Sequence, residues 1–240
     1  MRTFFVGQDG KMILDSDYSQ IELRVLSSMA EDSLMIDAFN SGIDVHSATA
    51  SQIFNVDVAD VTKEMRRKAK AVNFGIVYGI SDFGLAKNIG VGRTEAKMYI
   101  ESYLAKYSGI KDFMKNIILY AKEKGFVTTL YGRRRYVDEV NSKNKNIAKF
   151  GERIAMNAPI QGTAADIIKV AMNNVYKKLK SENMKSKLIM QVHDELIVEV
   201  EPGEEERAKE IVKEAMEHVI KLKVPLDIDM NIGLSWYDAK

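Results

Sequence analysis

Apolar runs typical of strands lie near both ends of the chain, and helical periodicity fills most of the middle. Residues 3–7 and 11–17 predict two short strands around an Asp-Gly turn, and residues 188–200 predict a hairpin. Residues 32–125 have helical periodicity that is interrupted by glycines but by no proline. Strands at both ends with helices between them predict an α+β fold, in which a large helical insertion interrupts one antiparallel sheet.

Proline positions help to delimit the remaining helical segments. A helix is expected to begin near Gln20, and a longer one over residues 146–180 contains Pro159. Because proline removes a backbone hydrogen-bond donor, we expect the longer helix to be kinked or broken there. A further helix is expected after Pro202, with acidic residues near its positive end, before a last strand over residues 226–234.

The composition limits the class of protein. The chain has 240 residues, of which 46% are hydrophobic, enough for one sizeable core or two small subdomains. It contains no cysteine, which excludes disulfides and cysteine-ligated zinc. Its first residues, MRTFFVGQDG, include no apolar stretch of the length that a signal peptide or a membrane span requires. We therefore expect a soluble, cytoplasmic protein with no membrane partner.

Charge is distributed unevenly, although the net charge is only +1. Residues 62–93 hold seven basic and two acidic residues (+5), and residues 131–153 hold seven basic and three acidic residues (+4). Residues 194–217 hold three basic and ten acidic residues (−7). The basic segments suit a polyanionic partner, and the acidic segment would repel that partner or hold cations. Solvated helix faces would give the same counts.

Two groups of carboxylates lie at the ends of predicted strands. In ILDSDYSQIELR, an apolar strand carries Asp15 and Asp17 on one face. In LIMQVHDELIVEV, Asp194 and Glu195 follow His193 between two apolar runs, without glycine or asparagine. If this hairpin lies beside the first strand, Asp17 and Asp194 converge and need a cation between them, for which Mg²⁺ is the best match. A capping aspartate and a polar hairpin tip are the alternatives.

A stripe of basic and aromatic residues is predicted on one helix, KEMRRKAKAVNFGIVYG. Arg66, Lys70, Phe74 and Tyr78 are spaced four apart, which places them along one slowly winding face. Two cations followed by two aromatic rings suit a nucleoside triphosphate, with the cations on phosphates and the rings on sugar and base. By spacing alone, the alternative is an amphipathic helix with core aromatics and solvated cations.

A second polar stripe, Arg153, Asn157 and Gln161, recurs every four residues in ERIAMNAPIQGTAADI. Long polar side chains on one face can reach the hydrogen-bond acceptors of a DNA minor groove. The arginines of YGRRRY, which include Arg133, suit a phosphate backbone. An exposed polar face and a solubilising loop are the alternatives.

Together these stretches resemble the family A DNA polymerases, the group of bacterial DNA polymerase I. DYSQIELR resembles motif A of that family, RRKAKAVNFGIVYG motif B and VHDE motif C, and NAPIQGTAADI and GRRRY also match, in the family's order. The resemblance extends over essentially the whole chain. It implies a palm over residues 1–30 and 146–240, fingers over residues 31–145, and transfer of dNTPs to the 3′ end of a primer on primer–template DNA.

The resemblance also implies roles for individual residues. Asp17, Asp194 and the backbone carbonyl of Tyr18 would bind two Mg²⁺ ions, with Mn²⁺ as a substitute. Glu195 would be an accessory acid, and Lys70 is a candidate proton donor to pyrophosphate. The implied nucleotide-binding residues are Gln20, Glu22, His46, Arg66, Lys70, Phe74 and Tyr78. The implied DNA-binding residues are Arg133, Arg153, Asn157, Gln161, Gln191 and His193.

Two features depart from the family pattern. The family's thumb and exonuclease portions would lie upstream, so we expect weak, salt-sensitive binding to primer–template and little extension by this chain alone. After the arginine run the chain reads YVDE where the family usually reads YLPE, so Asp138 replaces a proline that would restrain the loop. A non-catalytic DNA- or nucleotide-binding fragment and a metal-dependent nuclease are the alternatives to a polymerase. A nuclease would leave the stripe at residues 66–78 unexplained.

Overall fold

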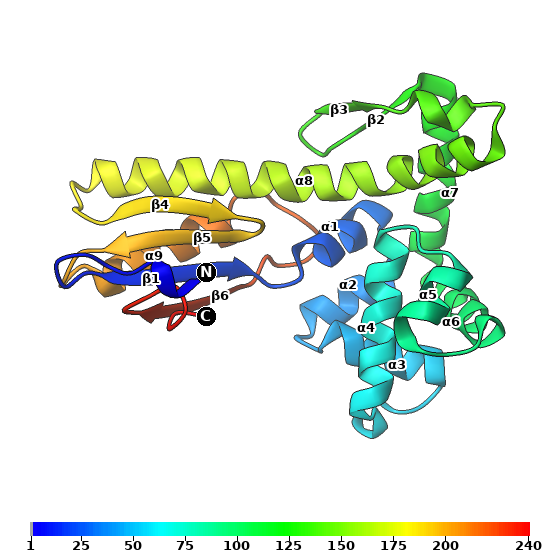
Figure 1. The fold of residues 1–240 in the computed structure, drawn as a ribbon, viewed down its shortest axis with the longest axis horizontal. Coiled ribbons are helices and arrows are strands. Elements are labelled where there is room, and N and C mark those ends of the chain that lie inside the picture. The colour runs from blue at the N-terminus through cyan, green and yellow to red at the C-terminus, as the bar shows by residue number, and fades with distance from the viewer. Residues whose placement is uncertain (1) are drawn as a thin grey trace. The chain divides into compact units, whose positions relative to one another are not determined.

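The computed structural model describes residues 2–240, which form two compact units (Figure 1). The sheet unit contains the chain up to Ile21 together with Ala164–Lys240, and the helical unit contains Glu22–Thr163. These bounds differ from the ranges expected for palm and fingers, because nearly all of α1 (Ile21–Ala30) and the first half of α8 (Lys145–Ser181) belong to the helical unit.

One antiparallel sheet forms the framework of the sheet unit. Its strand order is β4-β5-β1-β6. The strands are β1 (Met12–Tyr18), β4 (Lys187–Val192), β5 (Glu195–Val200) and β6 (Ile228–Gly233). This order confirms the predicted antiparallel sheet and the predicted hairpin at residues 188–200. Because β1 lies in the centre, between β5 and β6, its residues are held in register from both sides.

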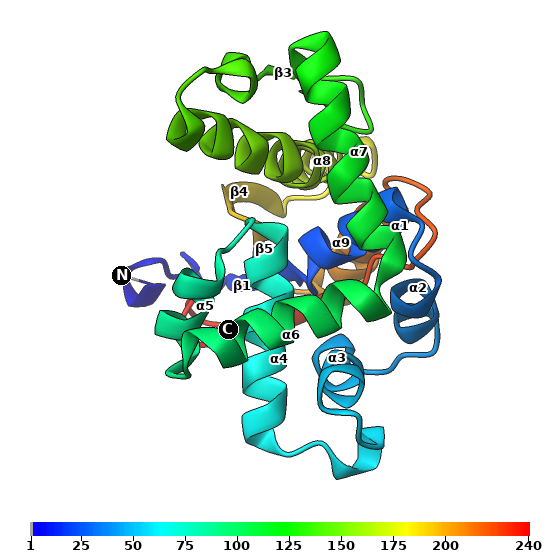
Figure 2. The ribbon, with the colours of Figure 1, turned by 90° about the vertical axis from the view of Figure 1, so that its right-hand side faces the viewer.

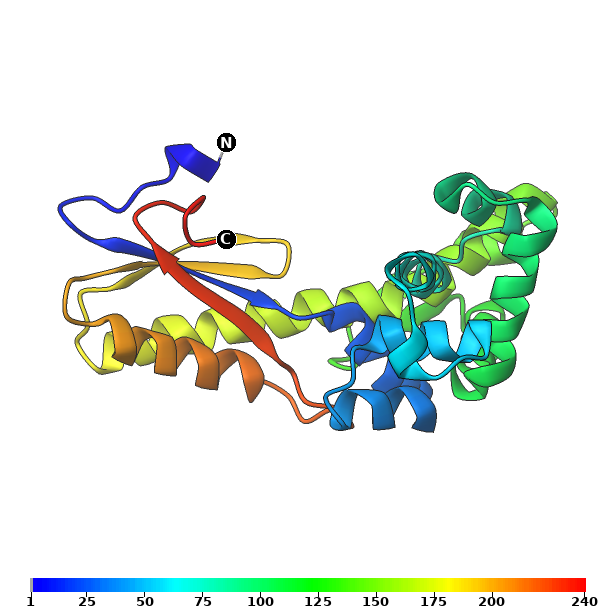
Figure 3. The same cartoon turned by 90° about the horizontal axis from the view of Figure 1, so that it is seen from below.

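The two faces of this sheet pack against different parts of the chain. On one face lies α9 (Glu205–Glu217), where the Tyr18 hydroxyl donates to the Met216 carbonyl at 2.7 Å. On the other face Trp236 packs with Ile13 and Ile197, so the terminal segments cover that side (Figure 3). Side chains alternate along a strand, so Asp15 and Asp17 share the face of Ile13.

The first predicted hairpin, with strands at residues 3–7 and 11–17, is wrong. Only its second strand, β1, is formed; Arg2–Phe4 is a short 3₁₀ helix, and Val6 makes an isolated bridge with Ser235. The physical reason is that both hydrogen-bonding edges of β1 are occupied, by β5 and by β6. The predicted turn remains, with the Lys11 amide donating to the Gln8 carbonyl at 3.0 Å.

The prediction that Pro159 breaks the long helix is also wrong. Helix α8 runs as one element from Lys145 to Ser181 with the proline inside it. Proline removes one backbone donor, while buried side chains on both sides of it, such as Ala155 and Ile160, anchor the flanking turns. Farther along, a buried stripe repeats every four residues and holds the second half of α8 in the sheet unit; it consists of Ile167, Ala171, Val175 and Leu179.

Seven helices and the first half of α8 build the helical unit, which confirms the predicted helical character of residues 32–125 (Figure 2). They are α1, α2 (Ser33–Asn40), α3 (Val45–Phe54), α4 (Lys63–Val77), α5 (Asp82–Ile89), α6 (Arg93–Lys106) and α7 (Ser108–Lys124). Several begin at a side chain that accepts a hydrogen bond from the amide three residues on. These capping residues are Asp32, Asp44, Thr62 and Ser81.

A small hairpin and a 3₁₀ helix lead from α7 into α8. Strands β2 (Phe126–Thr128) and β3 (Arg134–Tyr136) pair in an antiparallel manner, so two of the three consecutive arginines lie in a strand rather than in the loop. Asp138, where the family usually has proline, begins the 3₁₀ helix Asp138–Asn141. Over residues 2–240, no helix combines the length and the apolar character needed to cross a membrane.

Candidate functional site

The sheet unit brings three carboxylates together at one end of the β1–β5 pair. Asp17 lies opposite Glu195 in the strand register, and Asp194 occupies the turn between β4 and β5. The Tyr18 amide donates to the Asp194 carbonyl at 3.2 Å, which fastens the turn to the end of β1. The hairpin therefore lies beside the first strand, and the acidic groups converge as that arrangement predicts.

These three carboxylates and that of Asp15, two residues before Asp17, form a carboxylate cluster. Two cations from opposite ends of the chain compensate it. The Lys240 ammonium lies 2.7 Å from Asp17 Oδ2, 2.5 Å from Glu195 Oε1 and 3.8 Å from Asp15 Oδ2. Arg2 donates to Glu195 Oε1 at 3.0 Å. Sequence reasoning missed both cations, because neither lies in a recognisable pattern and only the folded sheet brings them here.

The cluster nevertheless remains short of positive charge and of hydrogen-bond donors. Burial raises the pKa of Asp15 to about 6, and the charge of Glu195 adds to this effect. Burial also raises the pKa of Asp194, with the charge of Asp17 contributing. Three buried oxygens, Asp15 Oδ1, Asp17 Oδ1 and Glu195 Oε2, have no hydrogen-bond partner. Unpaired carboxylate oxygens of this kind are costly, so the cluster can accept a further cation.

The donor set suits a hard divalent cation that needs few protein ligands. Among residues 2–240, no group of three or more His, Cys, Asp or Glu side chains is arranged to hold a metal ion. Mg²⁺ takes only one or two carboxylates and completes its shell with water and substrate phosphates. Asp17 and Asp194 therefore fit Mg²⁺ as a pair of oxygen ligands, with the Tyr18 carbonyl next to Asp17 along the chain.

The turn that carries Asp194 is stabilised by a short polar network. His193 has φ +51°, a left-handed conformation that is costly for a residue with a β-carbon. Its carbonyl accepts from Gln191 Nε2 at 2.7 Å, and Gln191 Oε1 accepts from Lys169 at 3.3 Å. Gln191 and His193, both predicted to contact DNA, thus lie in one network beside the carboxylates. Strained backbone of this type is common at functional sites.

In the helical unit, α4 presents the predicted stripe. Arg66 and Lys70 are exposed, Phe74 is half-buried, and Tyr78, the residue directly after α4, is exposed. The alternative of an amphipathic helix with core aromatics is therefore not found, because neither Phe74 nor Tyr78 is fully buried. Arg66 makes a two-pronged bond to Asp44, with distances of 2.8 and 2.9 Å. Burial acts to raise the pKa of Asp44, but hydrogen bonds from Arg66 and Ser47 hold it well below its usual value.

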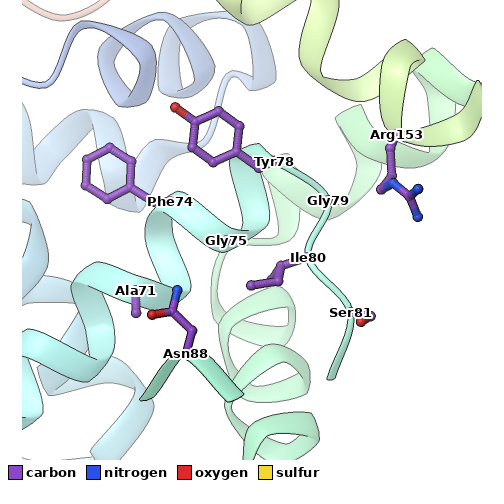
Figure 4. Close-up of a pocket in the computed structure, with 9 residues that line it drawn as sticks. All are labelled: Ala71, Phe74, Gly75, Tyr78, Gly79, Ile80, Ser81, Asn88 and Arg153. Carbon is purple, nitrogen blue, oxygen red and sulfur yellow. The ribbon is translucent and has the colours of Figure 1, made fainter. Parts of the chain in front are cut away.

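A cavity of about 430 Å³ lies beside the C-terminal end of this stripe (Figure 4). Phe74, Tyr78 and Arg153 are among its lining residues, so it joins the aromatic end of α4 to the polar stripe on α8. The Tyr78 hydroxyl donates to Glu22 Oε2 at 2.9 Å. Gly79 has φ +63°, and a β-carbon there would lie 3.0 Å from Arg153 Cγ, so glycine permits both the turn and this close approach.

His46 lies at the buried edge of the same region. His46 belongs to α3, and only 2% of the residue is exposed. The centroid of its ring lies 5.7 Å from that of Phe74. Burial lowers the pKa of His46 to about 4; the nearby Asp44 acts to raise it, and Arg66 and Lys70 act to lower it further. His46 is therefore a neutral imidazole at pH 7.

The depressed pKa of His46 predicts a pH-dependent loss of stability. The unfolded chain takes up the proton near pH 6.5, whereas the folded protein resists it until about pH 4. The free energy of unfolding that the neutral His46 contributes is thus complete above pH 6.5. It is lost as pH falls toward 4, by at most about 3 kcal/mol. Denaturant unfolding of wild type and His46→Gln at pH 7 and pH 4.5 measures this. Taking the difference between the variants removes the opposite contribution of Asp15, and a difference independent of pH would contradict the prediction.

The remaining predicted residues lie in both units. Gln20 precedes α1 with φ +56°, and its buried Oε1 has no partner. Arg133, at the β2–β3 loop, donates to the Gly162 carbonyl at 2.9 Å. Asn157 and Gln161 follow Arg153 at four-residue steps along α8, and Asn157 Oδ1 is buried without a partner. The second polar stripe therefore lies along one helix face, and its middle residue, Asn157, has an unsatisfied acceptor.

Known proteins similar to this chain define its family. The model of the family described as DNA polymerase family A matches residues 1–238. DNA polymerase I from Caldicellulosiruptor bescii is 52% identical over 240 residues, which cover all of this chain and 28% of that protein. DNA polymerase I from Geobacillus stearothermophilus is 52% identical over 239 residues, again all of this chain and 27% of the relative. The chain thus spans little more than a quarter of the length of these relatives.

A solved structure with the same fold supports this relationship. The POL domain of Pol1 from M. smegmatis, in complex with DNA primer–template and dNTP, superposes with a TM-score of 0.95 at 41% identity. The match covers 99% of this chain and 42% of that one. The motif positions, the antiparallel sheet and the helical insertion all lie within the matched residues. The chain therefore belongs to DNA polymerase family A.

Proposed function

We propose that these 240 residues are the catalytic core of a template-directed DNA polymerase, which transfers dNTPs to a primer 3′ hydroxyl. The sheet unit would be the palm and the helical unit the fingers. The observation that carries this proposal is the convergence of Asp17, Asp194 and Glu195, with buried oxygens that lack partners. We place the activity in the cytoplasm by analogy with the bacterial relatives.

We propose that Asp17 and Asp194, with the Tyr18 carbonyl, hold two Mg²⁺ ions, and that Mn²⁺ can replace them. Such ions activate the attacking hydroxyl and stabilise the charge that develops in an in-line displacement at phosphorus. The contribution of this chain is geometric: β1 and the β4–β5 hairpin fix the carboxylates, and Glu195, held by Arg2, adds charge beside them. Lys240 occupies a position that a metal ion would compete for.

Replacing Lys240 with methionine should therefore strengthen metal binding. An ammonium within 3 Å of two carboxylate oxygens opposes the approach of a second cation, although partial exposure of Lys240 screens the effect. We expect the Kd for Mn²⁺ to fall by about tenfold, measured by electron paramagnetic resonance of free Mn²⁺ at low salt. Lys11→Met is the matched control, because Lys11 pairs with Glu199 on the same sheet. A Kd that does not change in Lys240→Met would contradict competition at this site.

We propose that α4 binds the incoming dNTP. Arg66 and Lys70 would contact the triphosphate, and Lys70 would also donate a proton to the departing pyrophosphate. Phe74 would face the sugar and Tyr78 the templating position, and Gln20, Glu22 and His46 would be further contacts to the nucleotide. Because Arg66 is already paired with Asp44, a phosphate must share or replace that partner. Lys70 makes no ion pair with any described residue and lies 5.9 Å from the Phe74 ring centroid.

Glu22 should restrict the sugar of the nucleotide. Its carboxylate accepts a hydrogen bond from the Tyr78 hydroxyl, four residues along the chain from Phe74, the ring proposed to face the sugar. Glu22 would therefore fill the space that a 2′ hydroxyl needs. Glu22→Ala is expected to raise the ratio of ribonucleotide to deoxyribonucleotide incorporation by about tenfold. Single-nucleotide primer extension with each substrate measures the ratio. Tyr78→Phe, which removes only the hydrogen bond, should raise it less; an unchanged ratio in Glu22→Ala would remove Glu22 from this role.

We propose that primer–template DNA contacts Arg133, Arg153, Asn157, Gln161, Gln191 and His193. The first four lie in the helical unit and the last two in the sheet unit. The partnerless Asn157 Oδ1 is consistent with a polar ligand for that face. Binding by this chain alone should be weak and should fall steeply with salt, since most duplex affinity comes from neutralised phosphates. Fluorescence anisotropy of a labelled primer–template at two salt concentrations tests this proposal apart from catalysis.

A further inference from the structure

A buried polar network connects α3 with α4 behind the proposed nucleotide site. Asn73 Nδ2 lies 3.0 Å from His46 Nδ1 and 3.0 Å from the Thr49 hydroxyl. The Thr49 hydroxyl in turn lies 3.1 Å from the Tyr107 hydroxyl. All four side chains are almost completely buried, and Asn73 and Thr49 have no exposed surface. Buried polar groups that satisfy one another in this way hold their orientations firmly.

The chemistry of the amide determines which ring nitrogen of His46 carries the proton. An amide NH₂ group only donates, so a ring nitrogen that faces it must accept. With Asn73 Nδ2 against Nδ1, the single proton of the neutral ring is on Nε2. The second amide hydrogen is directed to Thr49, which gives both hydrogens of the NH₂ group a partner.

The network leaves one donor of His46 available for a ligand. No described residue hydrogen-bonds to His46 Nε2, and the ring contacts Phe74, next to the proposed triphosphate contacts. The charged groups that act on the ring are Asp44, Arg66 and Lys70. Two cations and a neutral N–H donor at one place suit a polyanion such as a triphosphate, because the N–H adds a hydrogen bond without a further buried charge.

We propose that Asn73 is a positioning residue that fixes His46 as the Nε2–H tautomer, so that His46 donates to an anionic oxygen of the bound nucleotide. The nucleotide part of this inference rests on the proposed function, whereas the tautomer does not. Nitrogen-15 NMR of the 240-residue chain without nucleotide tests the tautomer directly. The chain has only three histidines, His46, His193 and His218, so His46→Gln assigns the signals.

At pH 7, His46 of the wild type should give a pyridine-like Nδ1 and a pyrrole-like Nε2. A pyrrole-like Nδ1 in the wild type would overturn the proposal, because Asn73 would then accept rather than donate. In Asn73→Asp the carboxylate only accepts, so Nδ1 should become pyrrole-like. If that variant does not fold, Thr49→Val, which removes the partner of the second amide hydrogen, should give a mixture of tautomers. A wild-type spectrum in Thr49→Val would contradict the positioning role of the network.

The consequence for nucleotide binding is tested by equilibrium dialysis with labelled dATP and Mg²⁺. In Asn73→Asp the new carboxylate beside the ring should raise the pKa of His46. Above that pKa the neutral ring would carry its proton on Nδ1 and none on Nε2, and we expect dATP to bind about tenfold more weakly than to wild type. Lowering the pH should protonate the ring, restore Nε2–H and recover most of the affinity, a rescue that wild type does not show. Equal affinity at both pH values would overturn the role of His46 as a donor. Failure of wild type to bind dATP would count against the proposed function and leave the tautomer result standing.

Discussion

Asp17→Ala and Asp194→Ala should each reduce nucleotide addition by at least about a hundredfold, because each would remove an oxygen ligand from the proposed ions that stabilise developing charge at phosphorus. Glu195→Ala should reduce it less, by about tenfold, since Arg2 and Lys240 already neutralise that carboxylate. The assay is single-nucleotide extension of a labelled primer–template under conditions where wild type is active.

The structure provides a control for this loss of activity. Glu199 lies on β5 four residues from Glu195 and on the same face, but it pairs with Lys11. Glu199→Ala should therefore leave extension nearly unchanged. Thermal unfolding of Asp17→Ala and Asp194→Ala should remain close to wild type, because each change also removes like-charge repulsion within the cluster. Near-normal extension by folded Asp194→Ala would contradict the assignment of the metal ligands.

Lys70→Met is expected to lower kcat/KM for the dNTP by about a hundredfold, since it would remove the proposed charge-assisted contact to the triphosphate and the proposed proton donor. Lys70→Arg separates the two roles. Arginine retains the charge but does not give up a proton near neutral pH, so it should restore KM and leave kcat low. Steady-state kinetics with one dNTP measures both constants.

Lys68→Met is the matched control for Lys70→Met. Lys68 lies on α4 as well, but its ammonium is 3.6 Å from Glu95 and 5.8 Å from the ring centroid of Tyr99, away from the stripe. Its replacement should change kcat/KM by less than about threefold. Equal losses from the two changes would mean that the charge of α4 as a whole matters, rather than the position of Lys70.

The pattern of apolar residues predicted the parts of the fold that depend on local sequence. In three segments the spacing of apolar residues matches the element that forms there. They are the strand at residues 11–17, the hairpin at residues 188–200 and the helix of the basic stripe. The segment at residues 3–7 also looks like a strand, but strand formation there depends on a free edge. Since β5 and β6 occupy both edges of β1, the local pattern could not decide its structure.

The site was predictable where its residues share one element and was missed where they do not. Arg66, Lys70 and Phe74 share a helix, and Asp17 and Asp194 were expected to meet through one strand pairing. Lys240 and Arg2 reach the carboxylates from the two ends of the chain, so no spacing could indicate them. No motif or spacing in the sequence singles out Asn73. Its proposed role depends on its contact from α4 with His46 on α3.

Extension of a labelled primer–template by wild type and Asp194→Ala, with each of the four dNTPs in turn, tests the central claim most directly. At low salt with Mg²⁺, wild type should lengthen the primer only with the dNTP complementary to the template, EDTA should abolish the product, and Asp194→Ala should form almost none. Shortening of the primer would indicate a nuclease. Binding of both duplex and dNTP without lengthening, at every salt concentration, would indicate a non-catalytic fragment, and either result would contradict a polymerase core in these residues.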